Sequence, residues 1–401
     1  MRWVATLAAI LCVSSAVAVS FATRGNSEDK PIIIGDATAK TGWLSAYDGD
    51  GAKALMLSVD DINAKGGLLG RQLKVISSDS KTDPQQAYKA ATDVIQQGAS
   101  LVVASCDFDL GGPSSVAAEA AGVLSMSICA GSPKFGPQGV GPLTYTISTA
   151  AHVEGILLAE WAVKQGWDKP YVLMDTNLVY DRTQCGGFRW RWKDVGGGKP
   201  IVGDDSFKQD DPTISAQISR LKAANPKPNV IVICAAGPGA VSAVRQIFNS
   251  GLGIPILMGP AMDGQYWLNA VPNLTDFHMF IQASVFGDDP DPAVNDMVNR
   301  FEKKFGARPA TGYPIMGYSV AQAYALAATR AGSIDAPKVA AELDKFTGEK
   351  FLCGPRTFTK DVHIQLSWRG LGAQVMNGKW ASTGQYYTSQ VPLPVDQLFK
   401  E

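Results

Sequence analysis

Four segments of the sequence place acidic, aromatic or very small residues directly after a short apolar run. They are Cys106–Ser114, Cys129–Pro133, Asp175–Tyr180 and Gly259–Asp263. If the apolar runs are parallel strands, these segments lie at the carboxyl edge of a sheet, where open α/β sheets bind their ligands. Small residues let the backbone approach a ligand, and free amides at helix starts favour an anionic group. The spacing therefore predicts a small-molecule binding site built from these loops.

The elements that must position these loops form two series of predicted strands with helical stripes between them, a pattern typical of parallel βαβ units. A chain of 401 residues is too long for one compact core, so we expect two α/β domains in series. The strands of the first series are Ile32–Ile34, Leu73–Ile76, Leu101–Ala104 and Leu124–Ser127, and those of the second are Tyr171–Met174, Ile201–Phe207, Val230–Cys234 and Ile256–Met258.

Helix ends give the clearest local signals. An apolar stripe predicts a helix that stops at Gly66-Gly67, because glycine adopts the left-handed conformation that ends helices. Asp83-Pro84 predicts the next helix start, with an N-cap and a proline at the first position. Further along, we expect a strand over Met279–Val285, helices over Asp291–Phe305 and Pro314–Ala331, and strand-like pieces around Gln365–Leu366 and Ala373–Met376.

Composition and the N-terminal residues limit the class of protein. A net charge of −1 with 46% hydrophobic residues excludes a basic nucleic-acid-binding surface and a disordered acidic tail. Met1-Arg2, an apolar run and then small residues predict a cleaved signal peptide over residues 1–22, with cleavage after Ala18 or Ala22. The apolar run is too short to span a bilayer. We therefore expect an exported chain without a membrane span.

The cysteines point to a structural rather than a chemical role. Cys12 lies in the predicted signal peptide, and Leu11 before it argues against a lipid anchor. The remaining number is odd, so at least one thiol stays free in an oxidising compartment. Cys106 and Cys129 follow successive strands and could be neighbours, but the sequence does not give the distance between them. No CxxC pair and no histidine spacing supports a metal site, and no cofactor is expected.

The sequence motifs Asp60–Gly70 and Asp83–Ala87, preceded by Pro31–Gly35, resemble those of the leucine/isoleucine/valine-binding family of periplasmic ABC-transporter receptors. The resemblance covers nearly the whole chain after residue 30. It implies an α/β, type I periplasmic-binding-protein fold, in which two parallel-sheet lobes are joined by three crossover segments and hold a ligand cleft between them. The implied lobes are residues 30–149 with 284–359, and residues 150–283 with 360–401.

The same resemblance implies where the ligand lies. Asp107 and Phe108 align with a loop that holds the ligand's carboxylate, although Phe108 replaces the usual serine. Residues 130–132 match a small-residue-then-hydroxyl segment that also faces the ligand, and Tyr180 matches the aromatic residue that covers the ligand from the second lobe. The full set of expected ligand-binding residues is Trp43, Tyr47, Asp107, Phe108, Cys129, Ala130, Gly131, Ser132, Tyr180, Gly237, Ala261, Met262 and Asp263.

One departure from the family bears on the ligand. Amino-acid-binding members commonly place an acid after Gly259-Pro260 to balance the ligand's ammonium, and here that residue is Ala261. Burying an ammonium without a counter-charge costs several kcal/mol. Either Asp107 or Asp263 supplies the charge, or the ligand carries no ammonium. The expected ligand is a branched-chain amino acid or an apolar or aromatic carboxylic compound, and the second class is slightly favoured.

We compared three classes of function. A solute receptor would close its lobes on a small molecule and deliver it to ABC-transporter permease subunits, as a periplasmic monomer. An enzyme would need a nucleophile–base pair or a metal site, and the sequence has no such motif. A ligand sensor of the same fold would act on a signalling partner, and the predicted signal peptide argues against a cytoplasmic one. The sequence favours the receptor.

Overall fold

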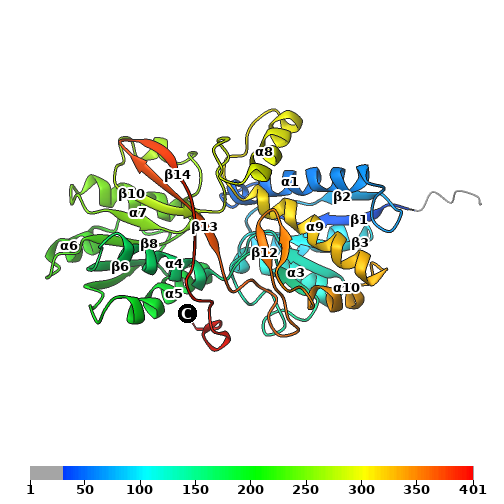
Figure 1. The fold of residues 1–401 in the computed structure, drawn as a ribbon, viewed down its shortest axis with the longest axis horizontal. Helices are drawn as coiled ribbons and strands as arrows, with labels where there is room; N and C mark the ends of the chain where they lie inside the picture. The colour runs from blue at the N-terminus through cyan, green and yellow to red at the C-terminus, as the bar shows by residue number, and fades with distance from the viewer. Residues whose placement is uncertain (1–29, 401) are drawn as a thin grey trace, which may run out of the picture. The chain divides into compact units, whose positions relative to one another are not determined.

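A computed structural model describes residues 30–400 of the chain, and the described part from Pro31 onward forms one compact unit. Figure 1 shows the chain coloured from blue at the N-terminus to red at the C-terminus. The predicted signal peptide and Cys12 lie outside the described residues. Within residues 30–400, no helix is both long and apolar enough to cross a membrane.

The first lobe is built on a five-stranded parallel sheet in the order β2-β1-β3-β4-β5. Its strands are β1 (Ile32–Asp36), β2 (Leu73–Ser77), β3 (Ala99–Ala104), β4 (Leu124–Ser127) and β5 (Thr144–Thr146). The helices that connect them are α1 (Ser45–Ala64), α2 (Pro84–Gln96) and α3 (Phe108–Ala120). β1, β3 and β4 are almost wholly buried, as expected of parallel strands covered by helices on both faces.

The second lobe is built on a seven-stranded sheet in the order β14-β13-β10-β9-β8-β6-β7. β6 to β10 are parallel, whereas β13 and β14 are antiparallel. The strands are β6 (Pro170–Asp175), β7 (Gly203–Phe207), β8 (Val230–Cys234), β9 (Ile256–Met258), β10 (Phe277–Ile281), β13 (Arg369–Met376) and β14 (Lys379–Thr388). The helices are α4 (Ala151–Lys164), α5 (Val179–Val195), α6 (Ser215–Ala223) and α7 (Gly237–Asn249), with the short turns η1 (Pro260–Met262), η2 (Leu268–Ala270) and η3 (Val395–Gln397).

After β10 the chain returns to the first lobe. Buried residues of this returning segment belong to the same hydrophobic core as β1, β3 and β4. α9 packs along α1, and the golden helices lie beside the blue ones in Figure 1. The elements of this segment are α8 (Pro292–Phe305), α9 (Pro314–Ala331), α10 (Ala336–Leu343), β11 (Glu349–Phe351) and β12 (Gly354–Arg356).

The helix start predicted at Asp83 and the helix end predicted at Gly66-Gly67 are both present in the structure. Asp83 caps α2, and its side chain accepts the amide of Gln86 at 2.8 Å. After α1, the Gly67 amide donates to the Ile62 carbonyl at 3.0 Å, with φ at 79°. A Cβ on Gly67 would lie 2.0 Å from the Arg71 carbonyl oxygen, so only glycine fits this stop. The glycine stop at Gly67 therefore ends α1 and turns the chain towards β2.

The predicted fold class is confirmed, and the predicted elements differ from the structure in a few places. Gln365 makes only an isolated bridge with Thr149, so no strand forms around residues 365–366. The strand predicted over Met279–Val285 lies instead at Phe277–Ile281. β14 was not predicted because it is largely exposed and lacks an apolar run. The predicted lobe boundaries stay a prediction.

Two disulfides join neighbouring elements of the same lobe. Cys106 after β3 pairs with Cys129 after β4, so the two cysteines that follow successive strands are joined. Cys185 of α5 pairs with Cys234 at the end of β8, which the sequence did not suggest. Cys353 is the free thiol among the described residues, in agreement with the odd count.

A candidate ligand-binding pocket

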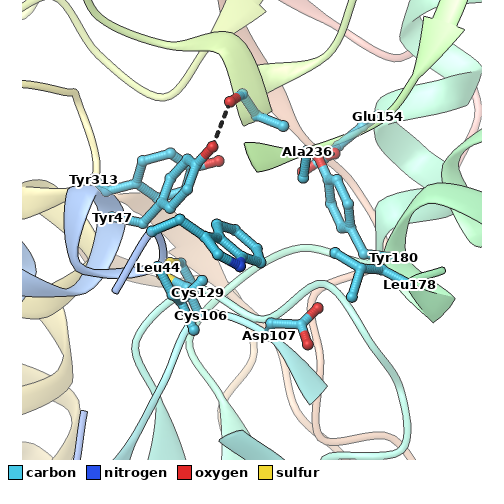
Figure 2. Close-up of a pocket in the computed structure, with 12 residues that line it drawn as sticks. Leu44, Tyr47, Cys106, Asp107, Cys129, Glu154, Leu178, Tyr180, Ala236 and Tyr313 are labelled. Carbon is cyan, nitrogen blue, oxygen red and sulfur yellow. Dashed lines mark hydrogen bonds between the residues drawn. A yellow bond between two sulfur atoms is a disulfide. The ribbon is translucent and has the colours of Figure 1, made fainter. Parts of the chain in front are cut away.

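A small cavity lies at the carboxyl ends of the strands of both sheets (Figure 2). Its lining residues come from the loops after β1, β3 and β4 of the first lobe, from those after β6, β8 and β9 of the second, and from the starts of α1, α4, α5 and α9. This is the position expected for a site in open α/β sheets. The twelve lining residues are Trp43, Leu44, Tyr47, Cys106, Asp107, Cys129, Glu154, Leu178, Tyr180, Ala236, Ala261 and Tyr313.

The two lobes touch across this cavity. The Tyr47 hydroxyl of the first lobe donates to the Ala261 carbonyl of the second at 2.7 Å, the dashed line in Figure 2. The cavity volume is about 30 Å³. A molecule of amino-acid size can enter only if the lining side chains move apart.

Aromatic rings form one wall of the cavity. The Tyr47 ring packs edge-on against Trp43 at 6.2 Å and against Tyr313 at 5.4 Å between ring centroids. Tyr47 is buried, and its hydroxyl also accepts a hydrogen bond from the Tyr266 hydroxyl at 3.3 Å. Such rings offer apolar area, and their faces attract cations. The wall is therefore suited to an apolar or cationic group.

Asp107 reaches the cavity from the first lobe. It is the N-cap of α3, and its carboxylate accepts the Leu110 amide at 2.9 Å. Burial is the main cause that raises the pKa of Asp107 to about 7, and the nearby carboxylates of Asp109 and Asp48 add to it. Asp107 thus caps a helix and at the same time presents an acid to the cavity.

Glu154 lies on the opposite side of the cavity, in the first turn of α4 (Figure 2). Its Oε2 accepts hydrogen bonds from the Tyr180 hydroxyl and the Gln184 amide nitrogen, both at 2.7 Å. Burial raises the pKa of Glu154 to about 8, although both hydrogen bonds oppose that shift. The sequence prediction missed this residue because it considered the loops after strands. The available signal was a lone acid within an otherwise apolar helical stripe, Ala151–Ala159.

The structure places six of the expected ligand-binding residues on the cavity. They are Trp43, Tyr47, Asp107, Cys129, Tyr180 and Ala261. Gly237 lies just beside it, since a Cβ on this residue would come within 2.9 Å of the Trp43 indole. Its φ of 61° also favours glycine. The indole is therefore held against the start of α7.

The remaining residues of the first lobe's expected site lie behind the cavity wall. The Phe108 ring packs edge-on against Phe135 at 5.2 Å between centroids. The Ala130 amide donates to the Ser127 hydroxyl at 3.0 Å, and the Gly131 carbonyl accepts the Ala151 amide at 2.9 Å. The Ser132 hydroxyl accepts the Lys134 amide at 3.3 Å. These groups are occupied within the fold.

In the second lobe, Met262 and Asp263 are buried, and neither is among the residues that line the cavity. Met262 packs in the core of the seven-stranded sheet. The Asp263 carboxylate accepts the Gly312 amide at 2.8 Å, and burial raises the pKa of Asp263 to about 7. Asp263 thus holds the segment that leads into α9.

A metal does not fit the cavity's acidic and sulfur groups. Within the described part of the chain, the group with metal-ligand spacing is Asp48, Cys106 and Cys129. Its two sulfur atoms form the disulfide, and the Asp48 carboxylate accepts the amides of Ala39 and Cys106. A disulfide sulfur cannot act as a thiolate ligand.

Two α/β lobes with a shared cavity at their sheet edges define a class of two-lobed ligand-binding proteins. The chain belongs to the periplasmic binding protein family, whose model matches residues 31–373. It is 24% identical over 328 residues to the Leu/Ile/Val-binding protein homolog 3 of Brucella melitensis, which covers 80% of this chain and 84% of that relative. Family membership implies a location outside the cytoplasm, and the family and its fold are non-enzymatic.

Solved structures show the same fold. The branched-chain amino acid transporter substrate binding protein LivJ of Streptococcus pneumoniae, in complex with isoleucine, has a TM-score of 0.76 at 21% identity and covers 90% of this chain and 100% of its own. A solute binding protein from R. palustris, in complex with benzoate, has a TM-score of 0.71 at 17% identity and covers 88% of this chain and 96% of its own. The fold is therefore that of the type I periplasmic binding proteins.

Proposed function

We propose that this protein is the periplasmic solute receptor of an ABC importer, exported through a cleaved signal peptide. It captures a small organic molecule between its lobes as a monomer and delivers it to the permease subunits. The ligand is a branched-chain amino acid or an apolar or aromatic carboxylic compound. Support comes from the family and from the two similar folds that hold isoleucine and benzoate.

The observation that carries the proposal is the cavity shared by the two lobes and crossed by the hydrogen bond from Tyr47 to Ala261. Each lobe supplies part of the lining, so a ligand makes all of its contacts only when the lobes are together. Binding then shifts the population towards the closed form. A transporter can read that closed form as the signal that the receptor is loaded.

A thermal-shift screen with amino acids, aromatic acids and short amides tests this function. A ligand at one hundred times its Kd stabilises the folded protein by about 2.7 kcal/mol, so a specific ligand raises the melting temperature measurably. Ligands found in the screen should compete with one another for one site. If no compound of these classes shifts the melting temperature, the proposed receptor function is wrong.

A further inference from the structure

Glu154 has an unused oxygen that faces the cavity. Both hydrogen bonds to this carboxylate, from Tyr180 and Gln184, go to Oε2. Among the described residues, no hydrogen bond is formed to Oε1, and this atom is not among the fully buried side-chain atoms that lack a partner. Glu154 as a whole is only 2% exposed. Burying an ionised carboxylate with one oxygen unpaired costs free energy, unless a partner donates a hydrogen bond to that oxygen.

The cavity supplies no positive charge for that partner. None of its twelve lining residues is a lysine, an arginine or a histidine, whereas two of them are acids, Asp107 and Glu154. The groups that act on Glu154 are the neutral donors Tyr180 and Gln184. Without a ligand the carboxyl group is therefore protonated at pH 7, and a cation that would stabilise its ionised form must come from outside the protein.

We propose that Glu154 binds the protonated amine of the ligand through Oε1, so that this receptor takes molecules that carry a primary ammonium beside an apolar body. The inference rests on the proposed receptor function and selects the ammonium-bearing class among its ligands. Glu154 then provides, from α4, the counter-charge that the loop after Gly259-Pro260 lacks at Ala261. A carboxylic compound without an amine offers no cation to the ionised carboxylate of Glu154.

The surroundings of Glu154 suit an ammonium group. Tyr180 of α5 contacts the carboxylate, and Tyr313 at the start of α9 faces it across the cavity (Figure 2). Asp107 at the start of α3 is the other acid on the cavity wall. The rings of Trp43 and Tyr47 can cover the apolar body of the ligand and also attract a cation. An ammonium group would donate a charge-assisted hydrogen bond to Oε1, the unpaired oxygen of the carboxylate.

The proposal predicts a proton released on binding. Burial raises the pKa of Glu154 to about 8, so at pH 7 the unliganded group holds its proton. The ammonium binds the ionised carboxylate, which means that this proton leaves when the ligand enters. Affinity should therefore increase with pH up to about 8, by at most about tenfold for each pH unit. Asp107 titrates near pH 7 as well, so Asp107→Asn is needed to separate the two groups.

Calorimetric titration of four probes tests the inference. The probes are L-leucine and L-phenylalanine, each compared with its amine-free counterpart, 4-methylpentanoate and 3-phenylpropanoate. At pH 7, at least one amino acid should bind with proton release, measured in buffers of different ionisation enthalpy, and its counterpart should bind far more weakly. Glu154→Gln, which copies the size of the protonated acid, should weaken amino-acid binding by about 30-fold or more and abolish the proton release.

Glu302→Gln is the matched control, because Glu302 is a half-exposed acid of α8 that pairs with Arg308. It should bind as the unaltered protein does. If Glu154→Gln fails to fold, the proton release of the unaltered protein and of Asp107→Asn decides the question. Amine-free compounds that bind as tightly, or normal binding by Glu154→Gln, would overturn the inference and leave the receptor function intact. If no probe and no compound of the screen binds, the receptor function fails, and this inference fails with it.

Discussion

Two acids face the same cavity from different lobes, and their local partners give them different roles. Asp107 is fixed by the Leu110 amide at the start of α3, so part of its hydrogen-bonding capacity belongs to the fold. Glu154 is fixed by Tyr180 and Gln184 through one oxygen only. Asp263, the other acid that the sequence suggested as a counter-charge, accepts a hydrogen bond from the Gly312 amide. Asp107 and Glu154 thus each keep one carboxylate oxygen without a hydrogen bond among the described residues, and Glu154 is the one of the two that lies in the second lobe, close to Ala261.

For single residues we predict that Tyr180→Ala weakens ligand binding by at least about tenfold. The change removes the aromatic ring from the cavity wall and also removes a hydrogen-bond donor to Glu154. The loss of folding stability should stay near 1 kcal/mol, the worth of one hydrogen bond. Equilibrium titration and denaturant unfolding measure the two effects. Tyr88→Ala, at an exposed site of α2, is the control and should change neither. Unchanged binding by Tyr180→Ala would place the second-lobe contact elsewhere.

Among the secondary-structure elements, α3 of the first lobe caps α5 of the second. The N-cap residue of α5, Leu178, makes no side-chain capping bond. The Asp109 carboxylate, in the first turn of α3, accepts the Val179 amide at 2.8 Å instead. A carboxylate at a helix N-terminus satisfies a free amide and is favoured by the helix dipole. This contact exists only while the lobes are together.

We therefore predict that Asp109→Ala lowers ligand affinity without a comparable loss of folding stability. Losing a helix cap costs about 1 kcal/mol, which corresponds to roughly a fivefold higher Kd when the cost falls on the closed form alone. Titration of the unaltered protein and of the variant measures this difference. Asp296→Ala removes an exposed acid of α8 and should leave the Kd unchanged. Equal affinity of Asp109→Ala and the unaltered protein would show that the cap does not stabilise closure.

At the scale of the whole molecule, the chain passes between the two sheets and back. Residues 148–150 lie beside Gln365, whose carbonyl accepts the Ala150 amide at 2.9 Å and whose amide donates to the Ser148 carbonyl at 3.3 Å. The segment predicted to join the lobes near residue 149 thus contacts Gln365, a few residues beyond the crossover predicted near residue 359. Paired connections of this kind allow a hinge rotation and oppose separation of the lobes.

We predict a closing motion about the crossovers near residues 149, 283 and 359. Small-angle scattering should show a smaller radius of gyration after addition of a ligand identified in the thermal-shift screen, because the lobes approach each other on binding. A compound that causes no thermal shift serves as the control. An unchanged radius with a ligand that demonstrably binds would contradict the closing mechanism.

Elements with strong local signals could be predicted from the amino-acid sequence alone. β4 and α9 have the predicted bounds, and Asp83 caps α2 as predicted, because apolar periodicity and capping chemistry act over a few residues. The rule that ligands bind at strand ends, together with the family resemblance, also placed Tyr180 and Asp107 at the cavity. The sequence pattern was sufficient to predict an element where the interactions that form the element involve residues close together in the chain.

Which distant residues share the cavity depends on the packing of the two lobes. Glu154 and Tyr313 begin helices that no strand-end rule selects, and Phe108 turns away to pack on Phe135. The disulfide between Cys185 and Cys234 likewise joins a helix to a strand 49 residues further along. Side-chain direction and burial depend on how the sheets and helices pack, which a local pattern does not contain. The free oxygen of Glu154 is a product of that packing.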